Sequence, residues 1–320
     1  MFLMNYLQNK GDLHMAQNEA PIILDETEQK IINIIDAHRD QIIDFAKDIY
    51  THAELGYKEF RTAEKFANFM KALGLPTKEH LAVTGVKAYL NEEKKDNVSL
   101  ALIGELDALR IPEHKYANPE TQGAHCCGHH AQLAGVIGAA IALTNPEVKE
   151  KLDGQVVLFA VPAEEYGEIE FKNKLTAEGK IKYGGGKCEL IRIGAFDDID
   201  LDIVHHIGDK DISGGSTDVG DVQHIQPVLT FNTGGKVSGL HSVDFDIVDD
   251  ELAYVVTAKI FALSAYRLLK NDAEKAKEVV ENYHPIFTKD AYIQYMNSFI
   301  SVEGGSPTEI NAPRGCAVIL

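Results

Sequence analysis

The most concentrated metal-binding chemistry in this chain lies at 125–130, which reads His-Cys-Cys-Gly-His-His. Thiolate and imidazole are the ligands that zinc and its first-row neighbours prefer. Cys127 and His129 flank one glycine and can turn toward a single point, because glycine tolerates positive φ and close backbone approach. Cys126 is adjacent to Cys127, and both cannot be ideal ligands of one ion without strain, so we expect one to pack inside. A loop that merely happens to be rich in histidine is the alternative, since the chain holds 13 His.

Two adjacent carboxylates, Glu164 and Glu165, directly follow the apolar run 156–163. Such a pair at a strand end can divide the work, because one carboxylate binds a metal while the other holds the proton removed from water. A solvated acidic pair is the competing interpretation and is favoured for this pair taken alone, since the chain has 49 acidic residues. A further carboxylate, Asp107 in the stretch 104–109, is expected to orient a ligand.

Imidazoles occur at two further places. His205 and His206 end an apolar run, and His241 precedes a long apolar segment. A single histidine in such a position is more often structural than a ligand. Together with the cysteine and the carboxylates, however, these residues supply the composition of a catalytic metal site from several strand ends.

The elements that must position these residues alternate between helices and short apolar strands. Helical patterns cover 26–50, 60–73, 132–143, 251–269 and 272–283. Strand-like apolar runs cover 98–103, 155–161 and 203–207. This alternation predicts an α/β domain with a largely buried sheet.

Composition limits the partners and the compartment. The formal charge of -18 argues against nucleic acid and anionic membranes, which would be repelled at long range. The helical patterns are too short or too charged to span a membrane. Only Cys126 and Cys127 are near each other among the four Cys, so no disulfide framework is indicated and a cytoplasmic location is the simplest expectation.

Six stretches resemble the metal-dependent amidohydrolases of the aminoacylase and carboxypeptidase family. The branch that they resemble includes hippurate hydrolases, indole-acetyl-amino-acid hydrolases, p-aminobenzoyl-glutamate hydrolases and related dipeptidases. The stretches follow the family's order along the chain: 105–109, 125–129, 162–165, 194–196 leading to His206, 216–218 and 239–241.

The resemblance implies a zinc-peptidase-like catalytic domain with a mixed, mostly parallel sheet, helices on both faces and two divalent metals, zinc or manganese, at the strand ends. It implies that Cys127 bridges the metals and that Glu164 is the general base that activates water. The other implied ligands are His129, Glu165, a strand-end histidine and His241. Spacing from Gly194 favours His206 over His205 for the strand-end position. His130 stands where the branch commonly has Asp or Asn, and is either harmless or a third imidazole near the metals.

One departure concerns the lid. Family members insert a smaller α/β domain between the strand-end histidine and the Ser-Thr-Asp segment, whereas here only the short interval from His206 to Ser216 is present. In relatives that domain resembles a dimerisation domain and supplies a histidine that polarises the scissile carbonyl. Losing one such donor typically costs about 10²–10³ in rate. The expected organisation is an N-terminal extension (1–25), a first catalytic part (26–213), a Gly-Gly joint (214–215), a second catalytic part (216–304) and a tail (305–320).

These observations predict a monomeric, binuclear metal-dependent amidohydrolase that acts on an N-acyl amino acid or a dipeptide-like substrate, with activity impaired by the missing lid. The first alternative is a catalytically silent, lidless metal-binding or interaction module. The second is a structural zinc protein with a closed four-ligand site and no role for Glu164.

Overall fold

The computed structural model describes residues 23–208 and 217–300. The expected Gly214–Gly215 joint, most of the N-terminal extension and the C-terminal tail lie outside the described residues.

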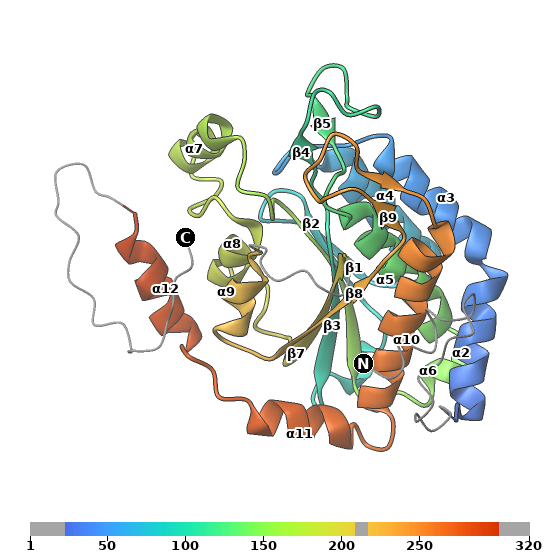
Figure 1. Cartoon of the computed structure of the whole chain (residues 1–320). Helices are drawn as coiled ribbons and strands as arrows, with labels where there is room; N and C mark the ends of the chain where they lie inside the picture. Colours follow the sequence, from blue (N-terminus) through green and yellow to red (C-terminus); the bar gives the residue numbers. More distant parts are fainter. Residues whose placement is uncertain (1–22, 209–216, 301–320) are drawn as a thin grey trace, which may run out of the picture.

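The centre of the molecule is a mixed, mostly parallel six-stranded sheet (Figure 1). Its strands, in spatial order, are β1 (Thr77–Leu81), β2 (Gly85–Tyr89), β6 (Gln155–Val161), β3 (Ser99–Glu105), β7 (Leu201–Ile207) and β8 (Val228–Thr233). The last four are parallel to one another, and β1 and β2 form an antiparallel edge. The predicted sheet type is confirmed. Because parallel strands end at the same edge, the residues after β3, β6 and β7 meet there.

Two short antiparallel pairs lie outside this sheet: β4 (Leu109–Arg110) with β5 (Gly123–Ala124), and β9 (Lys236–Val237) with β10 (Asp246–Ile247). Strand β8 follows the Ser-Thr-Asp segment in sequence and pairs with β7, which precedes it. The chain on both sides of the short interval therefore contributes to one sheet.

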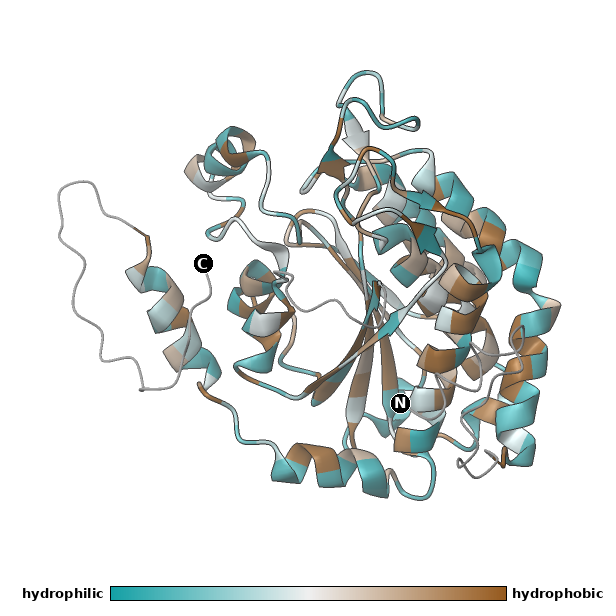
Figure 2. Cartoon of the chain, viewed as in Figure 1, coloured by the Kyte–Doolittle hydropathy of each residue, from teal (hydrophilic) through white to brown (hydrophobic). Residues whose placement is uncertain are grey.

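One face of the sheet is covered by the apolar helix α5 (His129–Leu143), which is buried along its whole length. Around α5 pack α2 (Glu26–Ala37), α3 (Arg39–Tyr50), α4 (Phe60–Ala72), α6 (Pro146–Lys149) and α10 (Val256–Leu269). Gly135 lets α10 approach α5 closely, because a Cβ there would lie 2.5 Å from Thr257 Cγ2. Figure 2 shows the brown, apolar strands and the teal, polar outer surfaces of these helices.

The opposite face carries shorter helices, so helices cover both faces as expected. They are α7 (Ile169–Ala177), α8 (Gly186–Arg192), α9 (Val219–Gln223) and α12 (Lys289–Ser298). Helix α11 (Glu274–Asn282) connects the two sides at the bottom of the sheet in Figure 1. A single turn of 3-10 helix, η1, covers Glu92–Lys94.

Two predicted helices differ in detail from those observed. The periodic pattern over 26–50 is interrupted at His38, whose ring Nδ1 contacts the Ile34 carbonyl oxygen at 2.8 Å and ends α2. The pattern over 251–269 begins with a π-helical turn, η2 (Glu251–Val255). Among the described residues, Glu251–Leu269 is the one helix with the length and hydropathy of a membrane span, and 78% of its apolar window is buried inside the molecule.

Candidate metal centre

The turn between β5 and α5 places Cys127 and His129 at the carboxyl edge of the sheet. Gly128 separates them with φ of +91°, and a Cβ there would lie only 2.1 Å from Ile207 Cγ2. Only glycine fits both the backbone conformation and this close approach. The turn therefore packs against the end of β7, and His129 becomes the first residue of α5.

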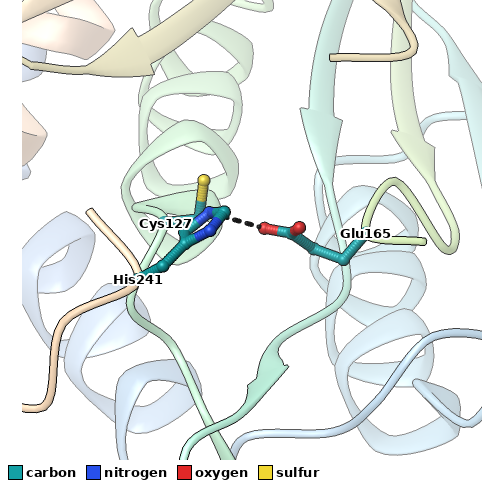
Figure 3. Close-up of side chains that lie close together, drawn as sticks. All are labelled: Cys127, Glu165 and His241. Atoms are coloured by element: carbon teal, nitrogen blue, oxygen red, sulfur yellow. Dashed lines mark ion pairs between the residues drawn. The ribbon is translucent and has the colours of Figure 1, made fainter. Parts of the chain in front are cut away.

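Cys127, Glu165 and His241 form one group of possible metal ligands (Figure 3). Their ligand atoms all lie within 4.8 Å of one another, and His241 Nε2 is 3.2 Å from Glu165 Oε1. The His241 backbone N–H donates to the Cys126 carbonyl oxygen at 2.8 Å, which fixes the His241 loop beside the turn. Hydrogen bonds with Cys127 and Glu165 raise the pKa of His241 to about 10, which shows how electron-rich its surroundings are.

Glu105, His129 and Glu164 form a second group, more deeply buried than the first. His129 Nε2 lies 3.0 Å from Glu105 Oε2 and 3.8 Å from Glu164 Oε2. Burial acts to lower the pKa of His129, but Glu105 and Cys127 raise it well above its ordinary value. Burial and the neighbouring Glu105 raise the pKa of Glu164 to about 9.

Asp107 connects the two groups from a fully buried position between β3 and β4. Its carbonyl oxygen accepts from His129 Nδ1 at 2.8 Å, which directs Nε2 of that ring toward the two glutamates. Its Oδ2 accepts from the Glu165 backbone N–H at 2.9 Å. Asp107 therefore holds one residue of each group in place, which is how an outer carboxylate orients metal ligands.

A buried cation lies behind the second group. Lys187 Nζ donates to Glu105 Oε1 at 2.6 Å and to Asp218 Oδ1, and its side chain is fully buried. Burial acts to raise the pKa of Glu105, but Lys187 and His129 hold it well below its ordinary value. Gln132 Nε2 donates to the other Glu105 oxygen at 2.8 Å. Glu105 is thus a fixed, ionised carboxylate against His129.

Sequence reasoning missed Lys187 altogether. The only local signal is the run of three glycines at 184–186 that precedes it. Its partners are 82 and 31 residues away along the chain, so no spacing rule connects them.

The two histidines at the end of β7 face opposite sides, as alternate residues of a strand must. His206 faces the cavity that contains the ligand groups. His205 is fully buried on the other face, where its Nε2 lies 2.7 Å from Thr233 Oγ1. This placement favours His206 as the residue available to a metal, and gives His205 a packing role.

The remaining residues of the 125–130 segment point away from the cavity. His130 stacks on Tyr50 with ring centroids 4.5 Å apart, and it also lies against His125. Cys126 is fully buried in the apolar core. His130 is therefore placed as a packed core ring, and it does not line the cavity.

A cavity of about 1000 Å³ opens onto both groups. Cys127, Glu164, Glu165, His206 and His241 form its polar floor. The rest of its lining comes from the segment 182–188, from α9 and from the end of α12.

The donor set suits divalent metal ions. It combines a thiolate with imidazoles and carboxylates, in an arrangement open to a cavity on one side, as catalytic zinc sites are. His129 Nε2 and Glu165 Oε1 are buried atoms that make no hydrogen bond to any described residue, which is costly unless a cation accepts their lone pairs.

Comparison with known proteins identifies the lineage of this site. The family model for peptidase family M20/M25/M40 matches residues 101–314, which include both ligand groups. The chain belongs to this family. The M20 catalytic fold is also found in the crystal structure of the YXEP protein of Bacillus subtilis, described as a dinuclear metal binding peptidase, with a TM-score of 0.59 and 15% identity over 73% of this chain and 98% of that one.

Curated relatives are more distant in length. The chain is 29% identical over 175 residues to the IAA-amino acid hydrolase ILR1-like 2 of Arabidopsis thaliana, covering 52% of this chain and 38% of that protein. It is 26% identical over 182 residues to a p-aminobenzoyl-glutamate hydrolase of Escherichia coli, covering 55% and 34%. The M20 chain thus spans less than half the length of these relatives.

Proposed function

We propose that this M20 protein is a binuclear metal-dependent amidohydrolase that releases an amino acid from an N-acyl amino acid or a dipeptide-like substrate. The observation that supports this most is Glu164. Its carboxyl group is buried at the cavity floor, next to His129 and beside Glu165, which belongs to the other ligand group. A structural site would not need a titratable acid of raised pKa facing its own cavity.

Five side chains would hold the two ions: Cys127 between them, with His129, Glu165, His206 and His241. Bound there, divalent ions supply Lewis-acid polarisation of a carbonyl group and lower the pKa of neighbouring acids. Asp107 fixes the ring of His129 and the backbone of Glu165, and Glu105 is held by Lys187.

Glu164 would handle the proton of the reaction. One of its oxygens takes the proton from the attacking water and returns it to the nitrogen of the leaving amine. Lys182, an exposed cation in the cavity lining, offers a charge for the carboxylate of the substrate.

The missing lid supports a slower enzyme than lidded relatives, because the short interval from His206 to Ser216 leaves no segment in which such a domain could be inserted. We retain the expected organisation of two catalytic parts, 26–213 and 216–304, joined at 214–215, and a monomer as the working state. A catalytically silent metal-binding module is the second candidate, and the same interval is the observation that favours it.

The test is metal analysis and turnover on one preparation. We expect up to two zinc or manganese ions per chain, and hydrolysis of members of a small N-acyl amino acid panel that stops with a chelator and returns with metal. Metal binding without any hydrolysis would favour the silent module. Failure to bind either ion after loading would refute both.

A further inference from the structure

Helix α12 lies at the far end of the described chain, yet it is fastened to the elements that form the cavity (Figure 1). Tyr292, almost fully buried, donates its hydroxyl proton to Asp221 of α9 at 2.7 Å. Tyr183, which lines the cavity, donates to the side chain of Asn297 at 3.0 Å. These are specific contacts with buried partners, so α12 holds a defined position beside the cavity.

The start of α12 is fixed as well. The Thr288 hydroxyl accepts from the Ala291 backbone N–H at 3.3 Å and caps the helix. Lys289 forms an ion pair with Asp197 at 2.6 Å. Just before the helix, the ring of Phe287 stacks on His224 with a centroid separation of 5.6 Å.

The free end of α12 presents apolar side chains to the cavity. Met296, Phe299 and Ile300 all belong to the lining that also contains the candidate metal ligands. Phe299 is 65% exposed and Ile300 is 42% exposed, although both are large and apolar. Large apolar side chains left open at the wall of a functional cavity mark a surface that a ligand covers.

We propose that the end of α12 is the specificity wall of this site and binds the apolar acyl group of the substrate. The inference rests on the proposed function and adds the substrate class, N-acyl amino acids with an extended alkyl or aryl acyl group. Its argument is continuity: the same cavity has a polar, ligand-bearing floor and an apolar wall, which matches a molecule with a polar amide and an apolar extension.

The test is a binding series with Phe299→Ala and a matched control, Phe60→Ala. Phe60 is 55% exposed and does not line the cavity. The probes are N-alkyl glycines from methyl to decyl, titrated calorimetrically into the metal-loaded protein. They contain an amine in place of the amide and cannot be hydrolysed.

We expect affinity to rise with alkyl length in the unmodified protein and in Phe60→Ala. In Phe299→Ala the decyl-to-methyl affinity ratio should fall about tenfold, because much of the apolar contact is removed. Thermal unfolding of both variants should match that of the unmodified protein, since both side chains are largely exposed. An unchanged ratio in Phe299→Ala, or no binding of any probe, would overturn the proposal.

Turnover of the corresponding N-acyl glycines separates this inference from the proposed function. Length-dependent binding that requires Phe299, with no turnover of any amide, would refute the hydrolase and leave the wall intact. Turnover with the same decanoyl-to-acetyl ratio of kcat/KM in Phe299→Ala would support the hydrolase and refute the wall.

Discussion

Replacing Lys187 with methionine tests the buried charge arrangement behind the candidate metal centre. The substitution keeps the approximate length of the side chain but removes the cation that bonds Glu105 at 2.6 Å and also Asp218. Glu105 is fully buried and the Asp218 side chain is 11% exposed, so water cannot take the place of the ammonium group. Removing one partner of a buried charge pair typically destabilises a protein by about 3–5 kcal/mol.

The expected loss for Lys187→Met is therefore about 3–5 kcal/mol in the free energy of unfolding. Urea unfolding followed by far-ultraviolet circular dichroism is the suitable assay, because the chain has no tryptophan to report by fluorescence. The matched control is Lys174→Met. Lys174 is 71% exposed and pairs with Glu178 at 3.9 Å, so its loss should cost no more than about 1 kcal/mol.

A compensating variant makes this prediction sharper. With Glu105→Gln and Asp218→Asn added to Lys187→Met, no carboxylate is left unpaired, and most of the lost stability should return. The reasoning is refuted if Lys187→Met unfolds within about 1 kcal/mol of the unmodified protein. It is also refuted if the triple variant is no more stable than the single one.

Two other substitutions follow from backbone geometry and from burial. Gly128→Ala should destabilise the protein by at least about 1–2 kcal/mol and weaken metal binding, since φ is +91° and the new Cβ overlaps Ile207; unchanged stability in denaturant titration would contradict the account of the turn. Asp202→Asn should stabilise the protein by about 2–4 kcal/mol at pH 8 but not at pH 4, as measured by urea unfolding at both values. Burial raises the pKa of Asp202 from 3.8 to about 7, so its protonated form favours folding below pH 3.8 and that advantage is lost as the pH rises through 7; an equal gain at both values would contradict this.

Elements with strong apolar patterns could be predicted from the sequence. The run 155–161 coincides with β6, because all seven residues are buried between helices on both faces. Edge strand β1 was missed, since its five residues alternate between exposed and half-buried positions and only one is strongly apolar. Helix α12 was missed for a similar reason, because only Tyr292 of its ten residues is buried.

The site divides in the same way. Cys127, His129, Glu164 and Glu165 are identified by local chemistry, because ligands that share a turn or a strand end are close in sequence as well as in space. The choice between His205 and His206 needs the strand's orientation, which only the sheet pairing gives. Lys187 and the end of α12 depend wholly on tertiary packing, and their residue types carry no signal of their own.

The central claim is that Glu164 acts on substrate at a metal centre that other residues build. The most direct measurement is the rate of hydrolysis of an N-acyl amino acid by metal-loaded Glu164→Gln, with its metal content determined on the same sample. Glu170→Gln, an exposed glutamate on α7, is the matched control. The account predicts full metal content and a rate lower by about 10²–10⁴ for Glu164→Gln, with no change for Glu170→Gln. A Glu164→Gln protein that hydrolyses the substrate at the unmodified rate would contradict it.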